Sequence, residues 1–493
     1  GYDIATSAVK AVIFDADKGI TISEAQSPET EMAINSPESG WAEQEPETWW
    51  QHLVTATQKA LTAVDIDKSR IWGIGISYQM HGLVLINEHK EVLRPAIIWC
   101  DSRAVTTGEK AFAALGSDYC TRYLLNSPGN FTASKLKWVK DNTPEIYGDG
   151  YAMLLPGDFI NMKLTGEINT TISALSEGIF WDFSRNKLSS ELMGLFDFKQ
   201  ELIPPLVACF GTQGIVNAKV AHELGIPEGI PVAYRAGDQP NNAFSLNVLN
   251  PGETAATAGT SGVIYTVSEK PFIDESFRFN SFAHVNYEIR NPRIGSLLCL
   301  NGAGILNSRT KKYLAQNRLS YSQINDLAAE IPPGSEGIRV LPFGNGAERI
   351  LNNRNIGAHF LNTDFNRHTD KHVFRAVQEG IVFALYYGMN IMKDCGIKPG
   401  IIRAGNANMF LSPAFKTTLA SLSGLPVEIF NTNGATGAAR GAALGTGFFK
   451  TEKEAFESLK CIEQVQPDKE TGEQLHSCYD DWCRLLNSIM QNK

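Results

Sequence analysis

The sequence predicts an α/β protein of two related lobes that face each other across a cleft. The chain has 493 residues, and single hydrophobic cores stop growing near ~250–300 residues, so two large domains are expected. Its first elements are predicted as three strands, a helix and a strand, an order that differs from the βαβ repeat of dinucleotide-binding domains. A similar strand, turn and strand pattern returns about half a chain later.

The first elements follow from apolar periodicity and turn residues. Residues 2–4, 9–14 and 20–25 are short β-type runs, and residues 17–19 form a hairpin turn. Pro46 then marks the first turn of a helix, and residues 71–77 form the next strand. The buried stripe of this helix recurs at three- and four-residue steps and contains Trp49, Leu53, Thr57, Leu61 and Val64.

The second half repeats the strand–turn–strand unit and then alternates helix and strand. Residues 3–7 lead into the strand at 9–14, and residues 258–262 lead in the same way into a strand at 263–267. The later elements are predicted as helix 371–395, strand 401–404, a helix capped at Ser412-Pro413 and ended by Gly424, strand 426–430, a small-residue helix opening at 433–437, and a final helix around 475–489.

Composition and charge limit the kinds of molecule and compartment that are expected for this protein. The net charge of −9 and the pI near 5.6 come without a large Lys/Arg cluster, which argues against nucleic acid. No apolar run approaches the ~20 residues needed to cross a bilayer, so no membrane span is expected. The eight cysteines form no CxxC pair, which is typical of reduced thiols in the cytoplasm. Whether a targeting segment has been removed is left open.

Two turns provide candidate phosphate-binding groups. Gly, Thr and Ser in tight turns present backbone N–H groups and hydroxyls to anionic oxygens. Thr6, Ser7 and Lys10 belong to the first turn, and Gly259, Thr260 and Ser261 belong to the second. Each turn alone fits a simple hairpin equally well. Facing each other from two lobes, they would bind ATP from both sides.

Two carboxylates stand where phosphoryl transfer needs them. Asp3 interrupts an apolar strand just before the first turn, where a charge is costly unless it meets a cation or donors, so it is a candidate ligand of magnesium. The alternative is an Asp that bonds nearby backbone. Asp238 follows a strand at 231–236, at the junction of the halves. Alone, residues 237–240 are more typical of a polar turn, but this position favours a catalytic base.

Two further segments are candidates for a sugar-binding wall. Met80 and His81 lie where one strand ends and another begins, although a lone His is more often structural. Residues 99–103 combine an aromatic ring with polar groups, and such mixtures bind sugars. Trp99 fits core packing equally well.

These motifs together resemble the FGGY family of carbohydrate kinases, and the resemblance runs essentially end to end. The matching segments are residues 1–10, 40–46 followed by Trp49-Trp50, 79–82, 93–99, 132–138 and 378–381. It implies two actin-like, ribonuclease-H-type lobes, here 1–245 and 246–493, with ATP between them and the sugar deeper in the cleft. It further implies that Asp3 helps to hold Mg²⁺–ATP.

The resemblance also implies the remaining roles. Met80 and His81 would contact a ketose, with Trp99 beside them, and Asp238 would accept the proton of its terminal hydroxyl. Thr6, Ser7, Lys10, Gly259, Thr260 and Ser261 would surround the phosphates, and Gly405 and Asn406 would lie near adenosine.

The implied reaction is phosphorylation of D-xylulose to D-xylulose 5-phosphate in pentose catabolism. The alternatives are ribulose, fuculose, rhamnulose, gluconate or glycerol as substrate, or a non-catalytic actin-like nucleotide switch. The oligomeric state stays open, with a homodimer as one candidate.

Four positions depart from the family pattern. Ala5 replaces a first-loop glycine, which would matter if that position needs a positive φ. Tyr78 replaces a glycine beside the Gln-Met-His triplet, and Gln239 stands where Asn commonly follows the catalytic Asp. Residues 404–407 replace a glycine triplet at the nucleotide.

Overall fold

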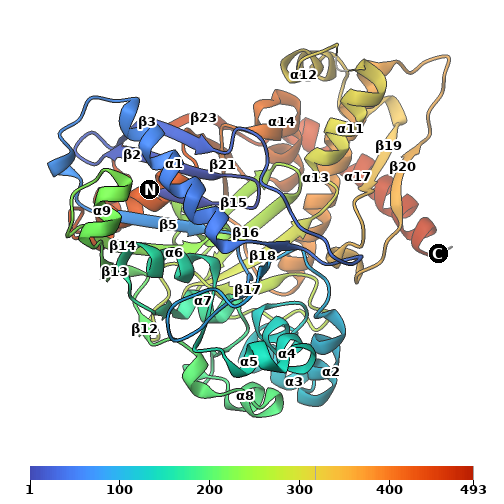
Figure 1. Ribbon diagram of the computed structural model, residues 1–493. Helices are drawn as coiled ribbons and strands as arrows, with labels where there is room; N and C mark the ends of the chain where they lie inside the picture. Colours follow the sequence, from blue (N-terminus) through green and yellow to red (C-terminus); the bar gives the residue numbers. More distant parts are fainter. Residues whose placement is uncertain (317, 492–493) are drawn as a thin grey trace.

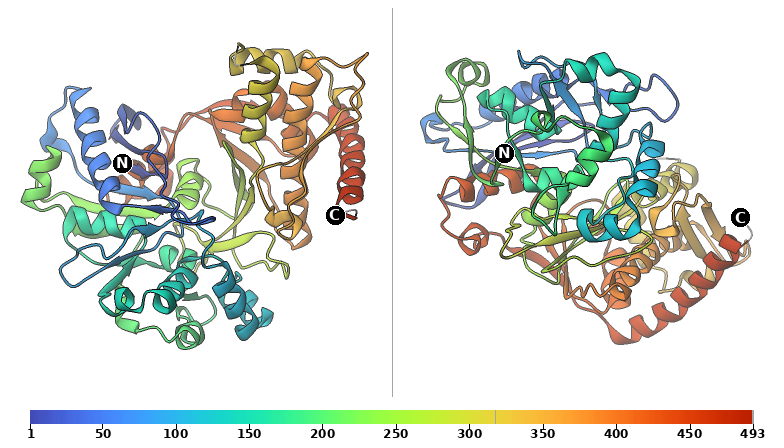
Figure 2. Two further views of the ribbon diagram at one scale, coloured as in Figure 1. Left: turned by 45° about the vertical axis from the view of Figure 1, so that its right-hand side comes forward. Right: turned by 90° about the horizontal axis from the view of Figure 1, so that it is seen from below.

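A computed structural model describes residues 1–316 and 318–491. The chain forms two α/β lobes, each built around one mixed sheet (Figure 1). The left view of Figure 2 shows the blue and green N-terminal lobe beside the yellow to red C-terminal lobe. The predicted fold class, two α/β lobes, is confirmed.

Six strands form the sheet of the N-terminal lobe, in the order β13-β14-β5-β1-β2-β3. β1, β2 and β3 pair as an antiparallel meander, whereas β5 and β14 continue the sheet in parallel with β1. The bounds are β1 (Tyr2–Ile4), β2 (Val9–Asp15), β3 (Ile20–Ser27), β5 (Ile74–Tyr78), β13 (Phe210–Ile215) and β14 (Pro231–Gly237). The predicted first three strands are therefore confirmed, and the fourth begins three residues later than expected.

Seven strands form the sheet of the C-terminal lobe, in the order β17-β18-β16-β15-β21-β22-β23. β15 and β16 form an antiparallel hairpin, and β21 and β22 extend the sheet in parallel with β15. The bounds are β15 (Glu253–Ala258), β16 (Gly262–Ser268), β17 (Asn280–Ala283), β18 (Ile294–Leu300), β21 (Ile401–Gly405), β22 (Val427–Phe430) and β23 (Cys461–Val465). Each lobe thus starts with a hairpin beside parallel strands, which confirms the predicted duplication.

The helices begin and end where the sequence provides caps. Pro46 opens α1 (Pro46–Thr62), and the helix buries Trp49, Leu53 and Leu61 along the expected stripe. The hydroxyl of Ser412 accepts a hydrogen bond from Phe415 N at the start of α14. The other principal helices are α2 (Val105–Leu115), α4 (Thr132–Asn142), α6 (Pro156–Thr165), α7 (Ile172–Glu177), α8 (Ser190–Phe196), α9 (Ala218–Leu224), α10 (Asp238–Ser245), α11 (Gly304–Ala315), α12 (Tyr321–Ala329), α13 (Asp370–Asp394), α14 (Pro413–Ser423), α15 (Gly434–Gly445) and α17 (Lys469–Gln491).

One helix from the second half of the chain covers the sheet of the first lobe. α15 packs against β5, β14 and β2, although it follows the C-terminal strand β22. In Figure 1 this orange segment lies among the blue strands near the N-terminus. Its run of glycine and alanine permits the close approach, because small side chains let the helix backbone come near the sheet. The two lobes are therefore connected twice, through α10 and through α15.

Two global features bear on earlier expectations. Within the described residues, no helix combines the length and the apolar character that a membrane span requires. All eight cysteines are free thiols, as the absence of a CxxC pair predicted.

Candidate active site

The first predicted phosphate turn connects β1 to β2 and is tied to the sugar-wall segments. The hydroxyl of Thr6 donates to Gln79 Oε1 at 3.2 Å and accepts from Trp99 Nε1 at 2.9 Å. Ser7 beside it is exposed, and Lys10 is the second residue of the return strand β2, opposite Asp3. Ala5 has no positive φ, so the replacement of glycine at this position causes no backbone strain.

Asp3 is the middle residue of β1 and lies between two groups that favour a carboxylate. Ser77 Oγ donates to Asp3 Oδ1 at 2.9 Å. The N-terminus of α15 meets the other oxygen so closely that a Cβ on Gly434 would lie 2.7 Å from Asp3 Oδ2. Burial raises the pKa of Asp3, while the Ser77 hydrogen bond and the charge of Lys10 lower it. Ser77 meets the predicted need for a donor, and the positive end of the α15 dipole lies beside the carboxylate.

The second predicted phosphate turn connects β15 to β16. Backbone N–H groups of Gly304 and Ile305, at the start of α11, donate to the carbonyls of Gly259 and Thr260 at 2.9 and 3.0 Å. The Asn408 side chain lies beside Gly259, 3.6 Å from where a Cβ would stand. This turn is thus held by backbone bonds from α11.

The predicted adenosine residues follow β21, which pairs in parallel with β15. Gly405 ends β21 and Asn406 is exposed. Because parallel strands present their carboxyl ends at one edge, Gly405 and Asn406 lie at the same edge of the sheet as the second turn. Ligands of α/β sheets bind at such edges.

His81 is neutral and tightly held in the predicted sugar wall. It has a φ of 60°, and its Nδ1 pairs with the carbonyl oxygen of Glu177 at 2.9 Å. Its ring meets Phe131 and Phe282 with centroid distances of 4.8 and 5.3 Å. Burial, with smaller contributions from the charges of Lys135 and Arg349, lowers the pKa of His81 to about 3. The imidazole can therefore exchange hydrogen bonds with a ligand but carries no charge.

Met80 and Trp99 complete the predicted wall. Met80 is buried, and its Cγ would lie 2.6 Å from a Cβ on Gly237, the residue before Asp238. The indole of Trp99 is 52% exposed, so this residue does not belong to the core. Its exposed face suits sugar stacking.

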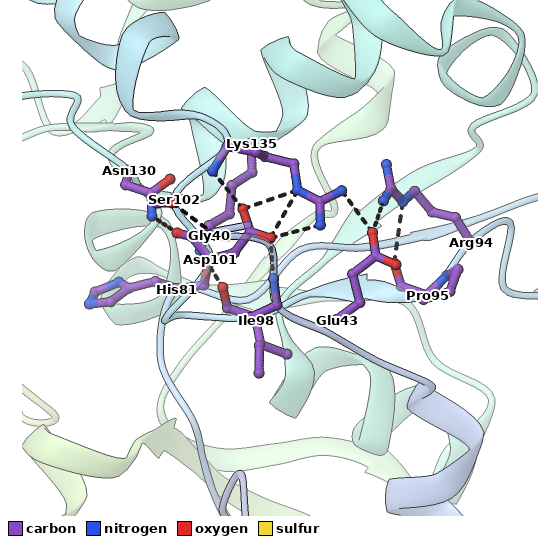
Figure 3. A network of polar contacts seen from close by, with 12 residues as sticks. Gly40, Glu43, His81, Arg94, Pro95, Ile98, Asp101, Ser102, Asn130 and Lys135 are labelled. Atoms are coloured by element: carbon purple, nitrogen blue, oxygen red, sulfur yellow. Dashed lines mark hydrogen bonds and ion pairs between the residues drawn. The ribbon is translucent and has the colours of Figure 1, made fainter. Parts of the chain in front are cut away.

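Two of the polar groups that follow Trp99, Asp101 and Arg103, do not line the cleft, contrary to the sequence-based expectation. Asp101 and Arg103 are fully buried and form a bidentate pair, and Arg103 also contacts Glu43 at 2.7 Å (Figure 3). The guanidinium stacks 3.8 Å from the centroid of Trp41. These groups fix the backbone behind the wall and have no capacity left for a ligand.

Lys135 anchors the wall from behind. Its Nζ donates to the carbonyl oxygens of His81 at 2.8 Å and Ile98 at 3.0 Å, which joins the two wall segments (Figure 3). Burial lowers the pKa of Lys135 to about 7. Lys135, which belongs to the segment 132–138 that resembles the family, is therefore structural.

Asp238 is the first residue of α10 rather than part of a turn. β14 ends at Gly237, and the helix continues through Pro240, which is tolerated in a first turn. Burial raises the pKa of Asp238 to about 7, and the nearby charge of Asp3 adds to the effect. Backbone hydrogen bonds from Gln239 and Asp238 itself act in the opposite direction. A carboxylate with such a pKa is well matched to proton transfer near neutral pH.

Sequence reasoning missed two residues that lie against this site. Glu177 ends α7, is 1% exposed, and its Oε2 would lie 2.6 Å from a Cβ on Gly237. Burial raises the pKa of Glu177 well above its usual range, and the nearby charges of Asp238 and Asp158 add to the effect. Gly434 was recognised only as a helix opener. No periodicity or spacing could have placed either residue, because both approach through long-range packing.

Tyr78 causes no obstruction of the cleft. Its ring is fully buried and packs on Gly157 of α6, on the side of the sheet away from α15. A cavity of about 730 Å³ also lies away from the candidate residues, at the start of β1, with Tyr2, Thr57, Trp72 and Phe448 in its lining. The candidate site instead occupies the opposite end of β1.

Comparison with known proteins agrees with this arrangement. The chain is 29% identical to the xylulose kinase of Klebsiella pneumoniae over 450 residues, which cover 90% of this chain and 88% of that protein. A crystal structure of xylulose kinase from Rhodospirillum rubrum has a TM-score of 0.86 at 24% identity and covers 100% of this chain and 98% of its own. Gluconate kinase from Lactobacillus acidophilus has a TM-score of 0.88 at 20% identity and covers 99% and 97%.

Family models account for most of the sequence. Residues 1–245 match the N-terminal domain of the FGGY family of carbohydrate kinases, and residues 254–448 match its C-terminal domain. The first matched range falls in the N-terminal lobe and the second in the C-terminal lobe. Members of the family phosphorylate sugars with ATP. The chain belongs to the FGGY family of carbohydrate kinases and is an ATP-dependent carbohydrate kinase.

Proposed function

We propose that the enzyme phosphorylates D-xylulose to D-xylulose 5-phosphate, with Asp238 as the catalytic base. We also propose that the boundary between the two lobes divides the chain into residues 1–245 and 246–493. The observation that carries this proposal is the meeting of Asp238, whose pKa is about 7, with Asp3, Met80 and His81 at one end of the first sheet. Xylulose kinases at 27–29% identity support the choice of sugar. A non-catalytic nucleotide switch is set aside by the family assignment.

The primary hydroxyl of the sugar loses its proton and gains the phosphoryl group. Asp238 accepts the proton of the primary hydroxyl, and the hydroxyl oxygen forms a bond to the γ-phosphorus of ATP. The bond between that phosphorus and the β,γ-bridging oxygen breaks, and ADP leaves. Phosphoryl transfer relies mainly on positioning and on stabilising charge. In this site the two turns, with Thr6, Ser7, Lys10, Gly259, Thr260 and Ser261, would supply donors to the phosphates, and Gly405 and Asn406 would lie near adenosine.

The carboxylates suit magnesium as the partner of ATP. Among the described residues, no group of three or more His, Cys, Asp or Glu side chains could hold a metal alone. Magnesium usually takes one or two carboxylates, water and substrate phosphates, and Asp3 with Asp238 nearby fits that donor set. Bound there, magnesium would neutralise part of the phosphate charge. Asp3 would hold it, with Ser77 orienting the carboxylate.

The sugar would lie against the wall formed by Met80, His81 and Trp99. His81 Nδ1 donates to the carbonyl of Glu177 in the neutral tautomer that this bond favours, which leaves Nε2 as an acceptor for a sugar hydroxyl. Trp99 would stack on the sugar while its Nε1 stays bonded to Thr6, so sugar and phosphate sites share one hydrogen-bond network. The free thiols suit a cytoplasmic enzyme.

A coupled ADP-release assay tests the proposed substrate. We expect D-xylulose to give the highest kcat/KM among D-xylulose, D- and L-ribulose, L-fuculose, L-rhamnulose, gluconate and glycerol, by at least about tenfold. One missing or misplaced hydroxyl partner in a hydrogen-bonded site costs far more than tenfold. Best activity with gluconate, glycerol or another ketose would overturn the substrate while leaving the kinase assignment intact.

A further inference from the structure

Arg349 carries a positive charge that the lobe does not neutralise. It is the first residue of η5 (Arg349–Leu351) in the C-terminal lobe and is partly buried. Among residues 1–316 and 318–491, no carboxylate or hydrogen-bond acceptor pairs with its guanidinium. Burial lowers its pKa. Because a desolvated charge without a partner costs free energy, such an arginine is typical of a site that takes an anion.

The neighbouring carboxylate is committed elsewhere. Glu348 accepts hydrogen bonds from the backbone N–H groups of Asn301 at 3.0 Å and Gly302 at 3.1 Å. Asn301 Nδ2 in turn donates to the carbonyl oxygen of Ala347 at 2.8 Å. Glu348 therefore fixes the backbone on which Arg349 stands, without forming an ion pair with it.

This anchoring places Arg349 beside the second turn. Residues 301–302 lead directly into α11, whose first N–H groups, those of Gly304 and Ile305, donate to the carbonyls of Gly259 and Thr260. The Arg349 charge also acts on two side chains. It opposes the rise in the pKa of Cys299 that burial causes, and it helps to lower the pKa of His81 in the other lobe. The backbone bonds made by Glu348 and by the start of α11 thus connect the segment that carries Arg349 to the second phosphate turn, and its charge also acts on His81 of the sugar wall.

We propose that Arg349 binds the phosphoryl group while it passes from ATP to the sugar hydroxyl. This inference rests on the proposed roles of Asp238 and the two turns. A guanidinium matches phosphate oxygens in geometry and keeps its charge, unlike a neutral histidine. As the bond from γ-phosphorus to the bridging oxygen breaks and the bond to the sugar oxygen forms, Arg349 balances the charge on the peripheral phosphoryl oxygens.

Arg349→Ala tests the proposal against wild type with the sugar that wild type phosphorylates best. We expect kcat to fall roughly 10²–10³-fold, as when a single donor to a developing charge is removed. The KM values for sugar and ATP should change by less than about threefold, since ground-state contacts remain. Arg309→Ala, which removes an exposed arginine of α11 in the same lobe, should leave kcat unchanged.

Two further readouts separate phosphate binding from a structural role. Guanidinium chloride at tens of millimolar should restore part of the kcat of Arg349→Ala and none of that of Asp238→Ala. The phosphorylated sugar should inhibit Arg349→Ala at least about tenfold less well than wild type, whereas binding of the unphosphorylated sugar stays the same. If Arg349→Ala does not fold, Arg349→Lys should keep the unfolding temperature and show the same weakened inhibition.

Three results would overturn the inference: an unchanged kcat, a loss shared equally between kcat and both KM values, or undiminished inhibition by the phosphorylated sugar. A wild-type enzyme inactive on every sugar tested would contradict the proposed function instead. The two failures are therefore distinguishable.

Discussion

Asp238→Ala is expected to lower sugar-dependent ADP release by roughly 10²–10⁴-fold, the usual contribution of a positioned general base. ATP binding should persist, because the turns around the phosphates lie on other strands. Sugar-dependent ADP release and ATP titration, both at pH 8, provide the measurements. Turnover within a few-fold of wild type would contradict the assignment of Asp238.

Matched variants separate catalysis from folding. Asp65→Ala removes an exposed carboxylate of the same lobe and should leave turnover unchanged. Asp238→Asn keeps the shape and should lose turnover as Asp238→Ala does. The folded pKa of Asp238 is about 7, above the ordinary value of 3.8, so folding takes up a proton between these values and the ionised form is destabilising above pH 7. Asp238→Asn should therefore raise the unfolding temperature more at pH 8 than at pH 5.

Lys135→Met is expected to reduce the free energy of unfolding by ~1–3 kcal/mol and to raise the KM for sugar several-fold. The substitution leaves the carbonyl of His81 without its donor, and an unsatisfied buried group costs ~1–3 kcal/mol, whereas the carbonyl of Ile98 still accepts from the backbone N–H of Asp101. Removal of a desolvated charge offsets part of that cost. Urea unfolding and sugar kinetics provide the two measurements.

The control for this prediction lies on the same helix. Lys137 pairs with Asp141 at the surface of α4, so Lys137→Met should change stability by less than about 1 kcal/mol and leave KM unchanged. A Lys135→Met protein with wild-type stability and wild-type KM for sugar would show that the bonds to His81 and Ile98 do not hold the wall.

Local patterns predicted the elements well where the signals were local. The hairpin of β1 and β2, the capped helix α14 and the repeat at 258–262 follow from turn residues, caps and alternation over a few positions. Residues 237–240 misled local reasoning, because Gly-Asp-Gln-Pro is a turn sequence that here opens α10. The preceding strand β14, rather than the composition of residues 237–240, determines that this segment opens a helix.

The candidate site was only partly predictable. Asp3 stood out because a carboxylate interrupts an apolar strand, and its partner Ser77 on β5 confirms that it meets a donor. The expectation that Asp101 and Arg103 face the sugar was wrong, because their mutual pairing and the stacking of Arg103 on Trp41 arise only after folding. Glu177 and Arg349 carried no pattern, because Glu177 is distinguished by burial and Arg349 by the lack of a partner among the described residues.

The dependence of kcat/KM for sugar on pH, at saturating magnesium and ATP, tests the role of Asp238 most directly. Only the ionised carboxylate can accept the hydroxyl proton, and burial together with the charge of Asp3 raises its pKa to about 7. We expect kcat/KM to be level above about pH 8 and to fall nearly tenfold for each pH unit below about 6. A profile that stays level from pH 8 down to pH 5, in a protein that remains folded, would contradict the account.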